Sequence, residues 1–445
     1  MLVVGLGTSG LAALRLLCRK GAVVIANDQR DEAALGETAE LARREGAELA
    51  LGGHDPALFT SVDAIVLSPG VPRIEALRAA EARGVPIISE LELSSRFVQA
   101  TIVGITGTNG KSTVTSLVGL MCENSGRPTF IGGNLGRPLA EIVGSEAAGP
   151  SGIAVVEISS FQLERLERLR VQVAALLNVT DDHLDRYRSF DEYAAVKGRI
   201  FERQQPEDAS VVPAGDRLCQ ALVSGSAARR FSFGGDSGAV RVIDDRIVDQ
   251  TSGLSFPIDE LKLNGEHNLW NVCAAALLAR LVGVPTKQIQ EVLASFDGLP
   301  HRMQKIRELG GVAYYDDSKA TNVGATVAAL DGLCRRRGKV VLIAGGIDKG
   351  GSYAPLRARL EHCGRAVVLI GQAASLIRAA LNGCAIEIEQ APTMESAVQA
   401  ASRLARPGDV VLLAPACSSF DMFRSYAQRG ELFQRAVRAL SEGST

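Results

Sequence analysis

Short apolar runs alternate with helix-like segments along the first part of the chain. Residues 2–5, 22–27, 63–68 and 86–88 are rich in Val, Ile and Leu, and an amphipathic segment begins at Gly10. Strands of a parallel sheet have this apolar character because helices cover both faces of the sheet. The pattern therefore predicts a Rossmann-like α/β domain, which we place at residues 1–93.

The same alternation returns in a second block, at residues 94–298. Apolar runs at 101–103, 153–158 and 173–179 predict strands, and periodic segments at 114–122, 190–201 and 266–281 predict helices. Between residues 209 and 256 the runs are short and divided by Gly and Asp, a pattern typical of a small antiparallel excursion.

A third block follows the Leu-Pro-His-Arg segment at residues 299–302, which we interpret as a linker. Strand-like runs at 312–315, 340–344, 366–370, 385–388 and 410–413 alternate with helical patterns, and the chain ends in a long helix. Residues 299–445 are therefore predicted to form a doubly wound, Rossmann-like domain. The fold class expected for the whole chain is α/β with three domains.

Composition narrows the class of protein further. The chain has 445 residues, of which 46% are hydrophobic and 22% charged, and its net charge is -2. So weak a charge creates no field that attracts nucleic acid or a membrane surface, and no apolar run is long enough to span a bilayer. The basic run at residues 335–337 is typical of a helix C-terminus and is too short to indicate a polyanion partner. We expect a monomeric protein of the cytoplasm.

The eight cysteines form no C-x-x-C pair. They lie within apolar helix and strand patterns, as reduced thiols of a cytoplasmic protein do, so we expect no disulfide framework.

A glycine-rich segment, GITGTNGKST at residues 104–113, joins a predicted strand to a predicted helix. In a phosphate-binding loop, successive backbone N–H groups point at one anion, and the helix N-terminus adds partial positive charge. Lys111 would then reach the β- and γ-phosphates, and the Ser112 or Thr113 hydroxyl would hold Mg²⁺. Ile105 occupies a place where the strict motif has glycine, and the alternative is an ordinary strand–helix turn with a solvated lysine.

The first domain has its own glycine-rich turn, GLGTSG at residues 5–10, and Asp28 follows at the end of the next strand. This arrangement is typical of a dinucleotide site. Another nucleotide on the same scaffold, or a tight turn alone, would also explain it.

Acidic and imidazole groups follow the strands of the second block. Glu157 ends one strand, and Asp182 and His183 end the next. Ligands of open α/β sheets bind at this edge, so we expect these side chains near Lys111. A carboxylate there suits Mg²⁺, and the alternative for Glu157 is a solvated glutamate at a strand end.

Lys197 lies on the helix predicted at residues 190–201, on the face turned toward this edge. An ammonium has no lone pair and cannot ligate Mg²⁺. The side chain either contacts a phosphate or reacts, as a neutral amine, with CO₂ to give a carbamate whose oxygens suit Mg²⁺.

Taken together, the ordered motifs resemble the Mur ligase family over essentially the whole chain. They are GTNGKST (107–113), EISSFQL (157–163), NVTDDHLD (178–185), GEHN (265–268) with Asn271, His301-Arg302, DDSKATN (316–322) and PACSSFD (415–421). The DDSKATN segment most resembles the member of the family that adds D-glutamate.

The resemblance implies an ATP-dependent ligase of peptidoglycan precursor synthesis. It would add D-glutamate to UDP-N-acetylmuramoyl-L-alanine through an acyl phosphate. The resemblance also implies two Mg²⁺ ions and favours a carbamate at Lys197. It revises the dinucleotide interpretation, because the glycine turn of the first domain would hold UDP.

Carried over by position, the resemblance assigns residues to each ligand. ATP would contact Gly107, Thr108, Asn109, Gly110, Lys111, Ser112, Thr113, Asn268, Asn271, Arg302 and Asp317. The UDP-substrate would contact Thr8, Ser9, Asp28, Arg30, Ser68, Gly70, Asn134 and His183, and D-glutamate would contact Thr321, Lys349, Ser419 and Tyr426. The metal ligands would be Ser112, Glu157, His183 and carbamylated Lys197. Catalysis would use Lys111, His183, Lys197 and Lys319, and Lys319 would also contact D-glutamate.

Other functions explain less of the chain. An oxidoreductase would use residues 5–10 and Asp28 but leave the phosphate-binding loop and the third domain without a role. A P-loop GTPase or motor needs guanine-specific or switch motifs, which we do not find. A folylpolyglutamate synthase shares the central loop but should lack residues 317–322, and a non-catalytic binding protein has little need for Lys111, Glu157 and Lys197 together.

Overall fold

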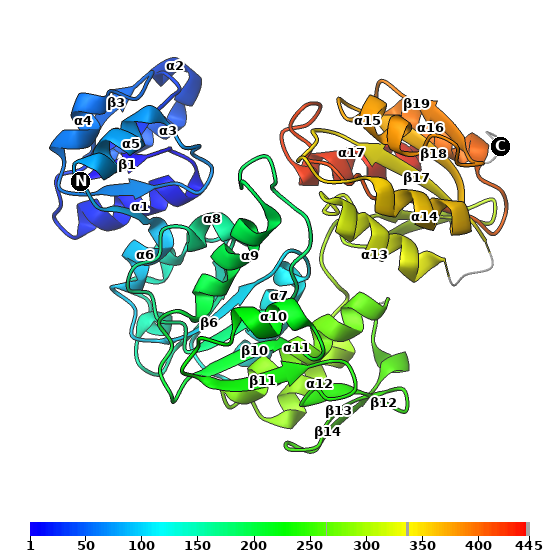
Figure 1. The fold of residues 1–445 in the computed structure, drawn as a ribbon, viewed down its shortest axis with the longest axis horizontal. Helices are drawn as coiled ribbons and strands as arrows, with labels where there is room; N and C mark the ends of the chain where they lie inside the picture. Colours follow the sequence, from blue (N-terminus) through cyan, green and yellow to red (C-terminus); the bar gives the residue numbers. More distant parts are fainter. Residues whose placement is uncertain (264, 335–337, 442–445) are drawn as a thin grey trace.

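The computed structural model describes residues 1–263, 265–334 and 338–441, so the basic run at residues 335–337 lies outside the described residues. Three β-sheets follow one another along the chain, each flanked by helices (Figure 1). The α/β fold with three domains is therefore confirmed. Within the described residues, no helix combines the length and the apolar character that crossing a bilayer requires.

The N-terminal sheet has five parallel strands in the order β3-β2-β1-β4-β5. The apolar pattern missed β3, because this edge strand is only half-buried and begins with the exposed Glu48. The strands are β1 (Leu2–Val4), β2 (Ile25–Asp28), β3 (Glu48–Leu51), β4 (Ile65–Leu67) and β5 (Ile87–Ser89). The helices are α1 (Thr8–Arg19), α2 (Glu32–Leu35), α3 (Glu37–Arg44), α4 (Pro56–Ser61) and α5 (Glu75–Ala82).

Helix α6 (Glu90–Ser95) connects the first sheet to the second and runs across residue 93. The domain boundaries at 93/94 and 298/299 therefore stay predictions. Glu92 of α6 is fully buried, and its Oε2 accepts hydrogen bonds of 3.0 Å from the backbone N–H groups of residues 167–169. These bonds attach the connecting helix to the central domain.

The central sheet has nine strands in the order β14-β13-β12-β11-β10-β9-β6-β8-β7. Strands β6 to β11 are parallel, and only the β12–β13 and β13–β14 pairs are antiparallel. The antiparallel segment expected over residues 209–256 is thus limited to the second half of that range. The expectation was too broad because an apolar run carries no information on strand direction. The strands are β6 (Thr101–Thr106), β7 (Thr129–Gly133), β8 (Ile153–Glu157), β9 (Val173–Leu176), β10 (Ala209–Pro213), β11 (Arg229–Phe233), β12 (Val240–Ile243), β13 (Arg246–Asp249) and β14 (Leu254–Pro257).

Two helices of the central domain set the position of the site. Helices α7 (Lys111–Asn124) and α11 (Glu266–Leu281) pack against each other and share one apolar core with strands of the central sheet. Every residue from Asn271 to Ala279 is buried, as expected for a helix that is apolar on all sides. The N-terminus of α11 therefore lies beside the start of α7. The other helices are α8 (Ser160–Leu163), α9 (Phe190–Gly198), α10 (Arg217–Leu222) and α12 (Thr286–Ser295).

The C-terminal sheet has six strands in the order β15-β16-β20-β17-β18-β19. Its edge strand β15 is antiparallel to β16 and was not expected, since its residues are mostly polar and half-buried. The strands are β15 (Gln304–Leu309), β16 (Val312–Asp316), β17 (Val340–Gly345), β18 (Gly364–Ile370), β19 (Glu387–Gln390) and β20 (Val410–Leu413). The helices are α13 (Val323–Leu333), α14 (Ala354–Cys363), α15 (Ala374–Ala380), α16 (Met394–Leu404) and α17 (Tyr426–Ala439).

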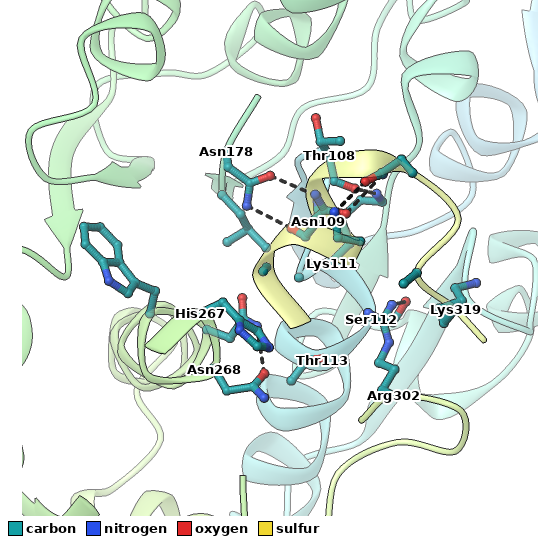
Figure 2. A pocket seen from close by; sticks show the side chains of 18 of the residues that line it. Thr108, Asn109, Lys111, Ser112, Thr113, Asn178, His267, Asn268, Arg302 and Lys319 are labelled. Carbon is teal, nitrogen blue, oxygen red and sulfur yellow. Dashed lines mark hydrogen bonds between the residues drawn. The ribbon is translucent and has the colours of Figure 1, made fainter. Parts of the chain in front are cut away.

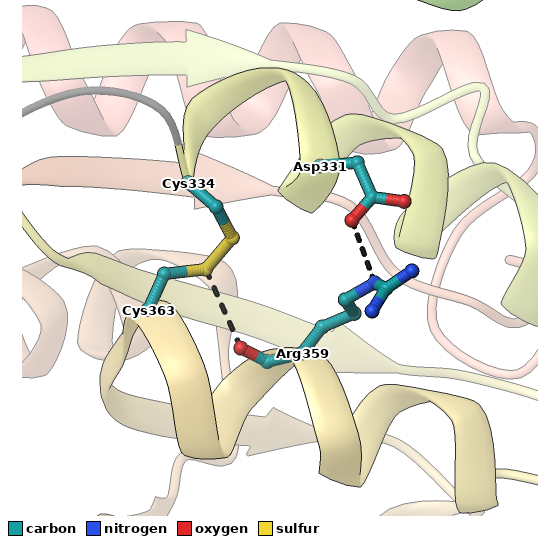
Figure 3. The surroundings of a disulfide bond; sticks show 4 residues. All are labelled: Asp331, Cys334, Arg359 and Cys363. Carbon is teal, nitrogen blue, oxygen red and sulfur yellow. Dashed lines mark hydrogen bonds and ion pairs between the residues drawn. A yellow bond between two sulfur atoms is a disulfide. The ribbon is translucent and has the colours of Figure 1, made fainter.

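A disulfide joins Cys334, directly after α13, to Cys363 at the end of α14 (Figure 3). The two Cα atoms are 5.3 Å apart, and the Asp331–Arg359 ion pair, at 2.6 Å, lies beside the bond. The expectation of reduced cysteines is therefore wrong for this pair, whereas the other six cysteines are free thiols. The pairing depends on the packing of α13 against α14, which cysteine spacing does not reveal.

Candidate active site between the central and C-terminal domains

Residues 107–110 form a tight loop between β6 and α7. Gly107 and Gly110 have φ angles of 151° and 85°, which residues other than glycine rarely adopt. A Cβ atom on Gly110 would lie 2.3 Å from Asn271 Oδ1, so glycine lets α11 approach the loop. The Asn178 side chain accepts a hydrogen bond from the Asn109 N–H at 2.8 Å and donates one to the Asn109 carbonyl at 3.1 Å (Figure 2). The loop is thus held rigidly in a conformation suited to bind an anion.

Lys111 lies over this loop. Its Nζ donates hydrogen bonds to the carbonyls of Gly107, at 2.9 Å, and Thr108, at 2.8 Å. Burial lowers the pKa of Lys111, although the carboxylates of Glu157 and Asp182 favour its charged form. If a phosphate bound in the loop, its oxygens could replace the Gly107 and Thr108 carbonyls as hydrogen-bond partners of the ammonium.

The C-terminal domain completes the site. Arg302 reaches across and donates a hydrogen bond of 3.0 Å to Ser112 Oγ. Figure 2 shows Asn268 on one side of the start of α7, and Arg302 and Lys319 on the other. A cavity of about 740 Å³ lies between the two domains. It is lined by the expected site residues Thr108, Asn109, Gly110, Lys111, Ser112, Thr113, Asn134, Glu157, His183, Asn268, Asn271, Arg302, Asp317, Lys319, Thr321 and Lys349.

Glu157 ends β8 and is only 2% exposed. Its Oε1 accepts a hydrogen bond of 2.7 Å from the Asn134 side chain, whereas its buried Oε2 has no hydrogen-bond partner among the residues that the structure describes. Burial raises the pKa of this carboxyl, but the Lys111 ammonium, the hydrogen bond from Asn134 and the nearby Ser112 hydroxyl outweigh that effect, so the pKa lies below its usual value. A buried, charged and unpartnered oxygen fits a Mg²⁺ ligand.

Lys197 is 1% exposed, and its Nζ donates a hydrogen bond of 2.8 Å to the Gly107 carbonyl. The amine also lies 4.6 Å from the centre of the Tyr193 ring. Burial and the nearby Lys111 ammonium hold the pKa of Lys197 well below its usual value. The helix therefore directs a weakly basic amine at the phosphate-binding loop, as the sequence predicted.

His183 follows β9 with a φ of 55° and packs edge-on against Phe161, with ring centroids 4.8 Å apart. Burial lowers the pKa of His183 to about 4, although the neighbouring Asp182 opposes the shift. The imidazole is therefore neutral at pH 7 and keeps a lone pair for a proton or a metal.

The described residues contain no group of three or more His, Cys, Asp or Glu side chains arranged to hold a metal. The predicted set supplies only Glu157 and His183 of these types, together with a hydroxyl and the Lys197 amine. Glu157 Oε2 fits Mg²⁺, but the unmodified Lys197 amine does not, so the full set requires the carbamate.

Two titratable groups that the C-terminal domain contributes to the cavity, Asp317 and Lys319, have shifted pKa values. Burial raises the pKa of Asp317 to about 7, against the influence of Arg302, and the Met303 N–H donates to Asp317 Oδ1 at 3.3 Å. Burial and the charges of Arg302 and Lys111 lower the pKa of Lys319 to about 8. Lys319 Nζ lies 3.8 Å from the centre of the Tyr426 ring. Tyr426 therefore packs against a residue of the cavity wall without lining the cavity itself.

Two expected D-glutamate residues do not line the cavity. Ser419 is buried, at 3% exposure, in the loop after β20, and Tyr426 begins α17. Thr321 and Lys349 do line it. The assignment of all four residues to D-glutamate stays a prediction.

Most of the expected UDP-substrate residues lie on the N-terminal domain and not on this cavity. Thr8 and Ser9 begin α1, whose N-cap Gly7 supplies no capping side chain. Arg30 pairs with Asp28 at 2.9 Å, and Ser68 Oγ donates to the Gly5 carbonyl at 2.6 Å. The group is completed by Gly70, while Asn134 and His183 lie on the cavity itself.

Several residues of the site had no role assigned from the sequence. Asn322 donates from its side chain to Asp182 Oδ2 at 3.0 Å and to Asn109 Oδ1 at 3.2 Å, which joins the two domains. His301 Nδ1 lies 2.7 Å from Asp316 Oδ2. Asp182, His301, Asp316 and Asn322 belong to the quoted motifs but had no assigned role, whereas Asn109 was assigned to ATP. Their membership of a motif was the only signal in the sequence that could have identified them.

Family models match three consecutive parts of the chain. They are the Mur ligase MurD-like N-terminal domain at residues 1–89, the Mur ligase middle domain at 105–279, and the Mur ligase glutamate ligase domain at 301–417. Curated relatives match from end to end. The chain belongs to the Mur ligase family, and it is an ATP-dependent ligase.

Two relatives are both named UDP-N-acetylmuramoylalanine--D-glutamate ligase. The protein of Desulfosudis oleivorans is 44% identical over 451 residues, covering 100% of this chain and 97% of its own. The protein of Geotalea daltonii is 45% identical over 455 residues, and the match covers 100% of this chain and 98% of the relative. A solved structure, UDP-N-acetylmuramate-alanine ligase MurC from Thermotoga maritima, shares the fold, with a TM-score of 0.61 at 19% identity over 98% of this chain and 99% of that one.

Proposed function

We propose that this chain adds D-glutamate to UDP-N-acetylmuramoyl-L-alanine in peptidoglycan precursor synthesis, with ATP converted to ADP and phosphate. One observation carries the proposal: a single cavity joins a phosphate-binding loop to cationic side chains of the neighbouring domain. Lys111 lies on one side, and Lys319 and Lys349 on the other. The shared name of the two full-length relatives supports the choice of substrates.

The reaction has two steps. The alanyl carboxylate attacks the γ-phosphorus and gives an acyl phosphate and ADP. The neutral amine of D-glutamate then attacks the acyl carbon, and phosphate leaves through a tetrahedral intermediate. Lys111 and the loop N–H groups would hold the phosphates in line with the carboxylate, because phosphoryl transfer depends on positioning and charge stabilisation.

Two Mg²⁺ ions would be held by Ser112, Glu157, His183 and Lys197. They would neutralise charge on the β- and γ-phosphates. Glu157 Oε2 supports this assignment, because none of the described residues forms a hydrogen bond with it. The low pKa of Lys197 supports its conversion to a carbamate, since only the neutral amine reacts with CO₂.

The remaining ATP contacts would come from Asn268 and Asn271 on the adenine side and from Asp317 in the C-terminal domain. Arg302 would exchange its hydrogen bond with Ser112 for a phosphate oxygen. The arginine would then compensate charge during phosphoryl transfer.

The UDP moiety would bind the N-terminal domain. The uncapped start of α1, with Thr8 and Ser9, suits a diphosphate, and the Asp28–Arg30 pair and the turn at Ser68 and Gly70 lie beside it. The muramoyl-alanine end would extend to Asn134 and His183.

Phosphate release tests the proposal. UDP-N-acetylmuramoyl-L-alanine and ATP are supplied with D-glutamate, L-glutamate or D-alanine, and reactions lacking each substrate serve as controls. Turnover is expected with D-glutamate alone. D-alanine lacks the second carboxylate that the site is built to pair, and L-glutamate has both carboxylates but the opposite configuration at the α-carbon. Equal use of D-alanine, or a preference for L-glutamate, would contradict the proposal.

A further inference from the structure

Arg429 of α17 is the largest fully buried side chain among the described residues, with 0% exposure. No carboxylate in the described ranges lies within 4.0 Å of its guanidinium; Asp316 and Asp421 act on it only at longer range. A buried charge without a paired carboxylate is rare, because desolvation of the ion is costly. Each of the three guanidinium nitrogen atoms nevertheless donates a hydrogen bond.

The guanidinium joins two loops. Nε donates to Ser318 Oγ at 3.0 Å and NH2 donates to the Ser318 carbonyl at 2.8 Å. NH1 donates to the Cys417 carbonyl at 3.1 Å. Ser318 Oγ in turn donates to the Tyr426 carbonyl at 2.7 Å, so α17 is part of the same network.

These two loops leave neighbouring parallel strands. Strands β16 and β20 pair along their length, with Asp316 opposite Leu413, and their loops continue from the same sheet edge. Lys319 follows Ser318 in one loop, and Ser419 comes two residues after Cys417 in the other. A backbone hydrogen bond from the Ala416 N–H to the Ala320 carbonyl, at 2.9 Å, also connects the two loops.

We propose that Arg429 is a positioning residue for the acceptor amino acid: its planar fork sets the spacing between Lys319 and Ser419. Arginine suits this role because its five N–H donors have fixed directions, whereas a lysine presents one point charge. The inference rests on the proposed D-glutamate site.

The ATP side of the same loop has supports of its own. The Asp317 N–H donates to the Leu413 carbonyl at 2.8 Å, and Asp317 Oδ1 accepts from the Met303 N–H. Neither bond involves Arg429. Loss of the arginine fork should therefore weaken acceptor binding and leave ATP binding nearly unchanged, which a general loss of folding would not do.

The test uses the full-length enzyme with Arg429→Lys and Arg429→Gln. The Michaelis constants for D-glutamate, ATP and the UDP-substrate are measured together with kcat and the melting temperature. Arg435→Gln, an exposed arginine of the same helix, is the matched control. We expect KM for D-glutamate to rise about tenfold to a hundredfold, the range for lost hydrogen bonds to a charged group, and KM for ATP to change less than about twofold.

Equal increases in all three Michaelis constants, or an unchanged KM for D-glutamate in a folded variant, would overturn the inference. If both Arg429 variants fail to fold, Ser318→Ala provides the answer, because it removes one acceptor of the fork and leaves the charge in place. A wild-type enzyme that does not use D-glutamate would instead refute the proposed function.

Discussion

Lys349 of the C-terminal domain forms an ion pair with Asp182 of the central domain, and its Nζ lies 3.2 Å from Asp182 Oδ1. The two side chains are only 18% and 7% exposed, so water screens the pair weakly. Asn322 at the start of α13 donates to the other carboxylate oxygen. Asp182 thus holds both an expected D-glutamate ligand and the start of a helix against the phosphate-binding loop.

Asp182→Asn should weaken acceptor binding. The substitution leaves the Lys349 ammonium buried without its counter-charge, and we expect kcat/KM for D-glutamate to fall about tenfold to a hundredfold. Steady-state kinetics with D-glutamate as the varied substrate measures the effect. Asp185→Asn, an exposed aspartate of the same segment, should behave like the wild type. An unchanged kcat/KM in Asp182→Asn would mean that the ion pair has no part in acceptor binding.

Lys111→Ala should remove phosphoryl transfer while the fold is kept. Lys111 supplies positive charge where the transferring phosphoryl group accumulates negative charge, so kcat should fall by about a hundredfold to a thousandfold. Trapping of the acyl phosphate with hydroxylamine measures the first step directly. Lys262→Ala, an exposed lysine of the same domain paired with Asp297, is the control. Near-normal trapping in Lys111→Ala would exclude the loop from the mechanism.

Lys197→Ala should be nearly inactive and should regain part of its rate in the presence of acetate or formate. The added carboxylate would occupy the place of the carbamate and provide the anionic oxygens that Mg²⁺ prefers. Lys111→Ala should gain nothing under the same conditions, because a carboxylate cannot replace an ammonium. Absence of rescue, together with a bare amine in a high-resolution map, would leave Lys197 as a phosphate ligand.

The pH dependence of acceptor use should report on Lys319. Burial and neighbouring cations lower its pKa to about 8, so the ammonium is present below that pH and is lost as the pH rises. The ratio of kcat/KM for D-glutamate between wild type and Lys319→Arg should therefore fall above pH 8, since a guanidinium keeps its charge. Taking the ratio cancels the ionisation of the D-glutamate amine. A ratio independent of pH from 7 to 9 would show that the Lys319 charge is not needed.

Reduction of the Cys334–Cys363 disulfide should destabilise the C-terminal domain. For a sequence separation of 29 residues, the loop-closure model gives a loss of about 3–4 kcal/mol in the free energy of unfolding. Urea unfolding with and without reductant measures this loss, and Cys363→Ser should be insensitive to reductant. If alkylation of the denatured, unreduced protein modifies all eight cysteines, the bond does not form in solution.

Periodicity predicted the central strands but only some of the edge strands: β5 and β19 were expected, whereas β3, β7 and β15 were missed. The runs at 340–344 and 410–413 became β17 and β20 because their side chains are buried on both faces. Strands β3 and β15 escaped detection, since edge strands with half-exposed side chains need no apolar run. The antiparallel part of the central sheet was also overestimated, because an apolar run carries no information on strand direction.

The sequence by itself determined that strand ends and glycine turns would place Lys111, Glu157 and His183 at one sheet edge, because these depend on residues close in sequence. Only the tertiary structure decided which groups distant in the sequence meet, both within a domain and between domains. The Asp182–Lys349 pair, the Arg302–Ser112 hydrogen bond and the Arg429 fork join residues far apart in the chain, and their partners are chosen by packing. Local patterns state which side chains are available, whereas the packing of the domains selects the ones that come together.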